Sequence, residues 1–147
     1  MNLVRVLQVV RYPEHDGSHL SASPSEPETL DRPAPAWAGI EEAIRRLDRR
    51  QYPYIWLCLR EQVSGEEPLG LNIMGGRGEF ALTISLPDQL VYFADDSRSG
   101  ELVQVWESDQ GSTLPESSLC GDLERVLSIA RHFTETGKPD PSARWVE

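Results

Sequence analysis

The sequence predicts a single α+β domain, in which a mostly antiparallel sheet of five or six strands has two main helices packed on one face. The length of 147 residues suits one domain. Two segments each carry one apolar stripe at helical spacing, and each such stripe needs a sheet face for its burial. Short turns join consecutive strand-like segments between them, which implies an antiparallel meander.

The N-terminal part of the chain contains one predicted strand and one long loop. Residues Leu3–Tyr12 alternate and are rich in β-branched types, so we expect a strand there. The next stretch, Pro13–Pro35, has five prolines among Ser, Glu and Asp. This composition excludes a helix and predicts a long polar loop, here named the Pro/Ser-rich stretch.

The first predicted helix is Trp37–Arg50. Its apolar stripe recurs at three- and four-residue spacings and consists of Trp37, Ile40, Ile44 and Leu47. Glutamates stand in its early turns and arginines toward its end, as the helix dipole favours. We therefore expect Trp37 to belong to the core.

The second predicted helix is Leu119–Thr136, which carries the same kind of stripe. A serine, either Ser117 or Ser118, is expected to cap its start. Gly137 is well placed to end it in a left-handed conformation. The helix is therefore bounded on both sides by residues of the appropriate type.

The middle of the chain is rich in strands. The strands predicted there are Tyr54–Arg60, Leu69–Met74, Glu79–Leu86, Leu90–Phe93 and Leu102–Trp106, the last of the sheet. Between two of them lies the glycine cluster Gly75–Gly78. We expect a tight hairpin turn at this cluster, because such turns require positive φ.

Side chains capable of catalysis or metal binding form no known pattern. His15 and His19 are four residues apart, but they lie in the Pro/Ser-rich stretch with no cysteine nearby. The segment Gly75–Gly78 has no lysine at the position a phosphate loop requires, and strands flank it. No nucleophile elbow occurs. We therefore expect no enzyme activity, catalytic residue, metal or cofactor; a small ligand-binding or enzymatic domain that uses Gly75–Gly78 is the alternative.

The cysteines and the hydropathy bear on the compartment. Cys58 and Cys120 lie far apart in apolar segments, so we expect buried free thiols, with one disulfide as the alternative. No segment approaches the roughly 18 apolar residues of a membrane span. The first ten residues have no small-residue cleavage site of a signal peptide. We therefore expect a cytoplasmic protein without a membrane partner.

Charge is distributed unevenly along the chain. The formal net charge of -10 argues against nucleic acid and anionic membranes as partners, because both need a basic surface. Most of the acidity lies between Glu61 and Glu124, where Arg77 and Arg98 are the only basic residues. This distribution of charge is common in acidic proteins, and it is also expected of a protein whose surface attracts a basic protein partner. The candidate partner-binding residues are the loop carboxylates Glu66, Glu67, Asp95, Asp96, Glu101, Glu107 and Asp109.

Three pieces of the sequence, in their order and spacing, resemble one known family. They are Ala43-Ile44-Arg45-Arg46-Leu47-Asp48, Leu71-Asn72-Ile73-Met74-Gly75-Gly76-Arg77-Gly78-Glu79-Phe80, and Ala130-Arg131-His132-Phe133-Thr134-Glu135-Thr136-Gly137-Lys138-Pro139, followed by Trp145. From roughly Trp37 to Trp145, the chain resembles immunity protein family one of bacterial polymorphic toxin systems. That family often has glycine after the Leu-Asp of the first helix, where this chain has Arg49 and Arg50 continuing the predicted helix.

The resemblance implies a small α+β domain that binds a toxin encoded beside it, often a nucleic-acid deaminase. Such a protein binds the toxin in the cytoplasm of the producing cell and prevents self-killing. Because no catalytic motif is visible in the sequence, we expect a one-to-one complex that covers the toxin's substrate site without modifying the toxin. A toxin that acts on nucleic acid needs a basic substrate channel, which acidic loops are suited to occupy. A secretion adaptor or chaperone is the alternative that shares this acidic surface.

Overall fold

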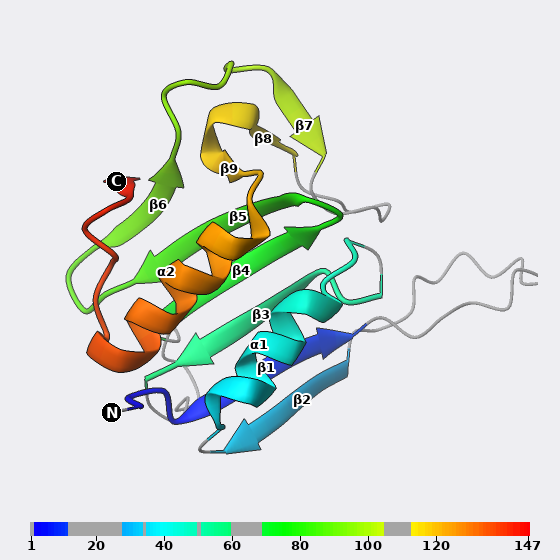
Figure 1. Ribbon diagram of the computed structural model, residues 1–147, viewed down its shortest axis with the longest axis vertical. Helices are drawn as coiled ribbons and strands as arrows, with labels where there is room; N and C mark the ends of the chain where they lie inside the picture. The colour runs from blue at the N-terminus through cyan, green and yellow to red at the C-terminus, as the bar shows by residue number, and fades with distance from the viewer. Residues whose placement is uncertain (1, 12–27, 34, 50, 60–68, 105–112) are drawn as a thin grey trace, which may run out of the picture.

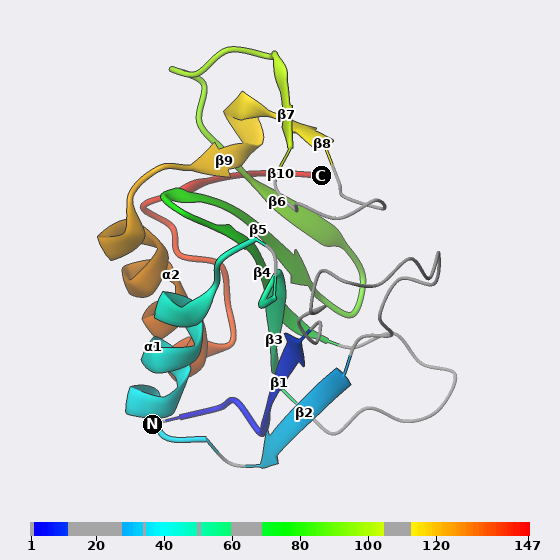
Figure 2. The ribbon, with the colours of Figure 1, turned by 90° about the vertical axis from the view of Figure 1, so that its right-hand side faces the viewer.

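A computed structural model of the protein describes residues 2–11, 28–33, 35–49, 51–59, 69–104 and 113–147. In this part of the chain, two helices, α1 (Trp37–Arg46) and α2 (Leu123–Thr136), cover one face of an eight-stranded antiparallel sheet (Figures 1 and 2). The predicted α+β class is therefore confirmed. The expected five or six strands were too few.

The main sheet has the strand order β10-β6-β5-β4-β3-β1-β2, and β9 pairs with β5 beside this path. Its strands are β1 (Val6–Arg11), β2 (Glu28–Pro33), β3 (Tyr54–Cys58), β4 (Gly70–Gly76), β5 (Glu79–Ser85), β6 (Leu90–Ala94), β9 (Leu119–Cys120) and β10 (Arg144–Val146). A separate hairpin pairs β7 (Leu102–Gln104) with β8 (Thr113–Pro115), and the 3-10 helix η1 (Glu116–Ser118) follows it.

The core lies between the helices and one face of the sheet. Alternate residues of the central strands point to this side, and those at most 1% exposed are Leu7, Ile55, Leu57, Leu71, Ile73, Leu82 and Ile84. Ile40 and Ile44 of α1 and Ile129 and Phe133 of α2 are fully buried against them. Trp37 packs against this core and is half-buried. The period-2 and helical stripes of the sequence therefore meet in one layer.

The first helix ends at Arg46, not at Arg50 as predicted. Helix propensity favours arginine, but a local turn takes over at Asp48. The N–H of Asp48 donates to the carbonyl of Tyr52 at 3.1 Å, and its carboxylate accepts the N–H of Tyr52 at 2.9 Å. Arg49 inside this turn has a φ of 70°, in the left-handed region that glycine adopts without strain.

The predicted Pro13–Pro35 loop contains a strand, and this prediction was wrong for Glu28–Pro33. These residues form β2 at the edge of the sheet and pair antiparallel with β1. The side chains of residues 29–33 are exposed, so the sequence has no apolar alternation to indicate a strand. Pro33 is tolerated because it ends an edge strand, where one side makes no ladder hydrogen bonds.

The second helix begins at Leu123 instead of Leu119. Its cap is Asp122, not Ser117 or Ser118: the carboxylate accepts the N–H groups of Glu124 at 3.0 Å and Arg125 at 3.4 Å. At its other end, Gly137 has a φ of 71° and ends the helix as predicted.

The strand at Leu102–Trp106 is also not the last one. In the described residues it covers Leu102–Gln104, and β8, β9 and β10 follow it. These strands have two or three residues each, too few to show an alternating pattern. Tertiary contacts hold β10 in place, since the ring of Trp145 packs edge-on against Phe93 of β6, with the ring centroids 6.1 Å apart.

The glycine cluster forms the predicted hairpin turn between β4 and β5. Arg77 and Gly78 both have positive φ, as the two central residues of a type I′ turn require. A Cβ at Gly76 would lie 2.5 Å from the carbonyl oxygen of Leu47, so the end of α1 approaches the sheet closely at this residue. The glycines therefore have packing reasons that are independent of any ligand.

Both cysteines are buried free thiols, as predicted. Burial, with a smaller contribution from the charge of Asp31, raises the pKa of Cys58 to about 11. Burial also raises the pKa of Cys120. Neither thiol is therefore ionised to a useful extent near neutral pH.

Candidate partner-binding surface

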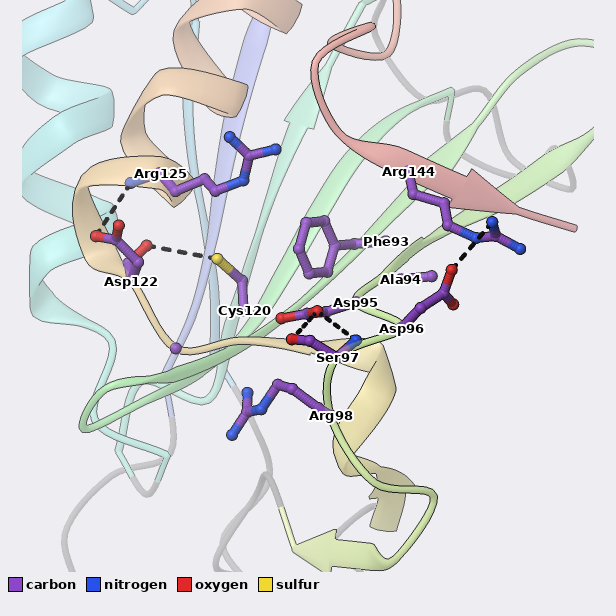
Figure 3. A pocket seen from close by; sticks show the side chains of 11 residues that line it. Phe93, Ala94, Asp95, Asp96, Ser97, Arg98, Cys120, Asp122, Arg125 and Arg144 are labelled. Atoms are coloured by element: carbon purple, nitrogen blue, oxygen red, sulfur yellow. Dashed lines mark hydrogen bonds and ion pairs between the residues drawn. The ribbon is translucent and has the colours of Figure 1, made fainter.

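Two of the predicted carboxylates, Asp95 and Asp96, lie in the turn that follows β6. They line a pocket of about 600 Å³ between this turn, β9 and the start of α2 (Figure 3). Phe93 and Cys120 also contribute to its lining. Two of the predicted partner-binding residues therefore lie together in the lining of a pocket.

Asp95 organises this turn. Its carboxylate accepts the N–H of Ser97 at 3.0 Å and the hydroxyl of Ser97 at 2.6 Å (Figure 3). These hydrogen bonds hold the pKa of Asp95 below its ordinary value. The N–H of Asp95 donates to the carbonyl of Ser117 at 2.7 Å and so joins the turn to η1. The side chain is therefore part of the local structure as well as of the surface.

Arg98 binds two glutamates of neighbouring segments. Its two terminal nitrogens each lie 2.7 Å from an oxygen of Glu79, and its Nε lies 3.3 Å from Glu116. One terminal nitrogen also donates to the carbonyl of Leu119 at 3.0 Å. The hydrogen bond to Glu79 raises the pKa of Arg98 and lowers that of Glu79. The paired Arg98–Glu79 contact therefore fixes β5 to the turn after β6.

The pocket is not purely acidic. Asp96 pairs with Arg144 at 3.0 Å, and Arg125 donates to the carbonyl of Ser142 at 2.8 Å. Asp95, Asp96 and Asp122 thus face an equal number of arginines in the lining: Arg98, Arg125 and Arg144. Arg125 and Arg144 lie outside the acidic segment Glu61–Glu124, and α2 and β10 bring them into the pocket. Charge counted along the sequence therefore overstates the acidity of this site.

The other predicted site residues are placed less informatively. Glu101 is exposed just before β7, and its carbonyl accepts the N–H of Glu116 at 2.8 Å, but it does not line the pocket. The remaining candidates and the two histidines considered as metal ligands lie outside the described residues: Glu66, Glu67, Glu107, Asp109, His15 and His19.

A second feature lies on the face of the sheet opposite the helices. Leu90, Tyr92 and Val146 are 41%, 39% and 38% exposed, and Tyr92 pairs directly with Val146 across β6 and β10. We name these three residues the β6–β10 patch. Exposed carboxylates flank it in sequence, with Asp88 before β6 and Glu147 after Val146. An apolar centre with a charged rim is the usual anatomy of a protein interface.

Sequence reasoning did not find the β6–β10 patch, although a signal was present. The predicted strand Leu90–Phe93 is apolar throughout, so one of its two faces has to lack cover if the helices occupy the other. Val91 and Phe93 are buried on the helix side, and Leu90 and Tyr92 point away from it. Only the layer arrangement decides which pair is exposed.

Neither a metal-binding cluster nor a membrane-spanning helix occurs in the described part of the chain. Within it, no group of three or more His, Cys, Asp or Glu side chains is placed to hold a metal ion. Neither of the described α-helices has the length and apolar character needed to cross a membrane.

The architecture defines an α+β domain with an antiparallel sheet whose helices share one face. The sequence matches no protein-family profile and no curated protein. The fold is similar to that of a hypothetical protein from Neisseria gonorrhoeae known from a crystal structure, with a TM-score of 0.57 and 12% identity. The match covers 96% of this chain and 95% of that one. At this identity the similarity concerns the fold alone.

Proposed function

We propose that the protein is an immunity protein, which binds a cognate bacterial toxin one to one in the cytoplasm of the producing cell. The toxin is of the class that acts on nucleic acid, a deaminase by the sequence resemblance. Binding covers its substrate site and leaves it chemically unchanged. The protein acts as an inhibitor by occupancy and needs no catalytic group of its own.

The observation that carries this proposal is the β6–β10 patch. Tyr92 is an exposed aromatic residue with an aliphatic neighbour on each side, Leu90 along its own strand and Val146 across the ladder. Interfaces obtain most of their binding free energy from a few such anchors, among which tyrosine is enriched. This cluster is therefore suited to bind a protein surface.

The charge of the protein supports a basic partner. A net charge of -10 attracts a basic protein over distance and raises the association rate at low salt. A toxin that binds nucleic acid presents a basic channel. An acidic protein that docks over this channel excludes the substrate, and its carboxylates take the place of the substrate's phosphates.

The backbone at Arg49 is consistent with the family resemblance. This residue follows Leu47-Asp48, at the position where the family often has glycine. Its φ of 70° is a conformation that glycine adopts without strain. The chain therefore has a glycine-like turn at a glycine position of the family, which supports the proposed membership through geometry.

The direct test is to titrate the purified protein into an activity assay of the toxin encoded beside it. We expect inhibition to saturate near equal molar amounts and toxin activity to return when the complex is dissociated. Leu90→Ser should weaken inhibition by about tenfold, because it removes part of the anchor cluster. Leu30→Ser is the matched control: Leu30 is also 41% exposed, but it lies on β2 at the opposite edge of the sheet.

Two outcomes would overturn the proposal. Substoichiometric inactivation, or a changed mass of the toxin, would indicate turnover by an enzyme. A complex that forms without any loss of toxin activity would indicate an adaptor or chaperone. Equal effects of Leu90→Ser and Leu30→Ser on inhibition would leave the proposed immunity function standing but would reject the β6–β10 patch as the anchor.

A further inference from the structure

A small cavity lies on the helix-free face of the sheet, next to the β6–β10 patch. Asn72, Thr83 and Tyr92 are neighbours on the adjacent strands β4, β5 and β6 and line one side of it. Leu114 of β8 and Ser118 of η1 line it from the hairpin side. Its volume is about 170 Å³. We name it the Asn72 cavity.

The amide of Asn72 is the main polar group of this cavity. Asn72 is only 9% exposed, and its side-chain nitrogen donates to the carbonyl of Ile55 at 3.0 Å. A carbonyl only accepts hydrogen bonds, so this contact fixes which amide atom faces β3. The amide oxygen accepts no hydrogen bond from any described residue. This oxygen is not among the buried side-chain atoms without a partner in the described residues, so it is accessible from the cavity, where a donor of the occupant can reach it.

The lining decides the charge of the occupant. Its other residues include Met74 and Thr83, and among the described residues that form it none is ionisable except Tyr92. A lysine or arginine head placed there would lose its hydration without gaining a carboxylate. A neutral group that donates one hydrogen bond to Asn72 meets no such penalty.

The size of the Asn72 cavity decides the kind of occupant. Small-molecule sites commonly have volumes of roughly 300–1,000 Å³, so this cavity is small for a metabolite. A cavity of about 150 Å³ holds one benzene molecule, so about 170 Å³ has room for one aromatic ring. The side chains that dominate interface binding are Trp, Tyr and Arg. The uncharged lining excludes Arg, and room for a single ring excludes the two-ring indole of Trp, which leaves Tyr.

We propose that the Asn72 cavity receives one uncharged aromatic side chain with a hydrogen-bond donor, a tyrosine, from the bound toxin. This inference rests on the proposed function and names the contact that completes its interface. Tyr92 belongs both to the β6–β10 patch and to the cavity, so one partner surface reaches both. The donor of the inserted ring binds the amide oxygen of Asn72.

The first experiment uses the free protein and two small probes, p-cresol and toluene, which differ by one hydroxyl. In an NMR titration, p-cresol should shift the side-chain amide signal of Asn72 and bind about fivefold tighter than toluene, the expected effect of one hydrogen bond. Asn72→Leu should remove this preference. Gln8→Leu is the matched control, because Gln8 lies in the same cross-strand row but outside the cavity lining.

The second experiment measures toxin affinity. Asn72→Leu and, as a variant that keeps the sheet intact, Leu114→Trp should each weaken binding about tenfold or more, while Gln8→Leu should leave it unchanged. Unchanged affinity in both cavity variants would overturn this inference and leave the proposed function standing. If p-cresol binds as expected but the wild-type protein does not associate with the toxin, the proposed function fails, and the toxin as source of the ring fails with it.

Discussion

The two faces of the main sheet are built from the same strands but differ in composition and cover. The face under α1 and α2 is lined by fully buried aliphatic side chains, of which Ile73 and Leu82 are a directly paired example. The opposite face carries a cross-strand row of mixed character: Gln8, Trp56, Asn72, Thr83 and Tyr92. A row of this kind contributes less to stability and retains groups that a partner binds.

The difference follows from what covers each face. Two amphipathic helices exclude water from one side, so any polar group there would be costly. On the other side, the β7–β8 hairpin and η1 cover only part of the sheet (Figure 2). There, Leu114 and Val103 pack against the small cluster of Leu119 and Ala81. Polar and aromatic residues are therefore tolerated beside this hairpin, where they form the Asn72 cavity and the β6–β10 patch.

The largest expected effect tests the helix-covered face. Phe133 of α2 is fully buried in the core, and Phe133→Ala should lower the free energy of unfolding by about 3–5 kcal/mol. Tyr92→Ala on the opposite face should lower it by only about 1 kcal/mol, because the ring is 39% exposed. Denaturant unfolding of both variants measures the contrast. Equal losses would mean that the helix-free face is also core.

A smaller effect on stability is expected at the contact between Arg98 and Glu79, which joins β5 to the turn after β6. Glu79→Gln should destabilise the protein by about 2 kcal/mol at pH 7, since Gln keeps one neutral acceptor and loses the other of two charge-assisted hydrogen bonds to Arg98. Glu116→Gln, which loses one longer contact of 3.3 Å, should cost less.

The pH dependence of this variant has a defined sign. The pKa of Glu79 is lower in the folded protein, so its contribution is complete above the unfolded-state pKa of about 4.3 and is lost as pH falls through the folded value. The wild-type and Glu79→Gln proteins should therefore begin to converge in stability as the pH falls below about 4.3 and should continue to do so at lower pH. Asp95 and Asp140, whose pKa values are also lowered, titrate in both proteins. A constant difference from pH 7 to pH 3 would contradict this role of Glu79.

The contrast between the faces also explains what sequence reasoning reached. Strands and helices with buried stripes, such as β5 and α2, were predicted because burial imposes a period on the sequence. The edge strand β2 and the cap at Asp122 were missed, because exposed strands have no such period and several residues near the helix start qualify as caps. The β6–β10 patch was missed because only the layer order determines which face of β6 is free.

The candidate site was predicted less well than the fold for a related reason. Charge along the sequence identified Asp95 and Asp96, which do lie together beside a pocket. It did not identify Arg125 and Arg144, because α2 and β10 bring them from outside the acidic segment. The electrostatics of a surface depend on tertiary neighbours, which local composition does not contain.

A third test concerns the turn that leads from α1 to the sheet. Arg49 has a left-handed backbone, and its Nε is buried without a hydrogen-bond partner. Arg49→Gly should be about 1 kcal/mol more stable than Arg49→Ala, since both remove the side chain but only alanine retains the strain of positive φ. Thermal unfolding of the pair measures this difference. Equal stability would mean that the turn relaxes to negative φ.

The smallest expected effect on stability separates charge on the two sides of the molecule. Asp96 and Glu135 are both exposed carboxylates, and each forms an ion pair. Asp96 pairs with Arg144 near the β6–β10 patch, and Glu135 pairs with Arg131 on α2. Reversal of either charge should change the free energy of unfolding by less than about 0.5 kcal/mol, because exposed ion pairs contribute little. Asp96→Lys should nevertheless slow association with a basic toxin severalfold at low salt, since charges at the rim of an interface set the association rate. Glu135→Lys places the same charge change on the helix side and should slow it less. Stopped-flow association at increasing salt distinguishes the two, and the gap should close as screening removes the field. If both variants slow association equally at every salt concentration, only net charge matters and the helix-free face is not the docking side.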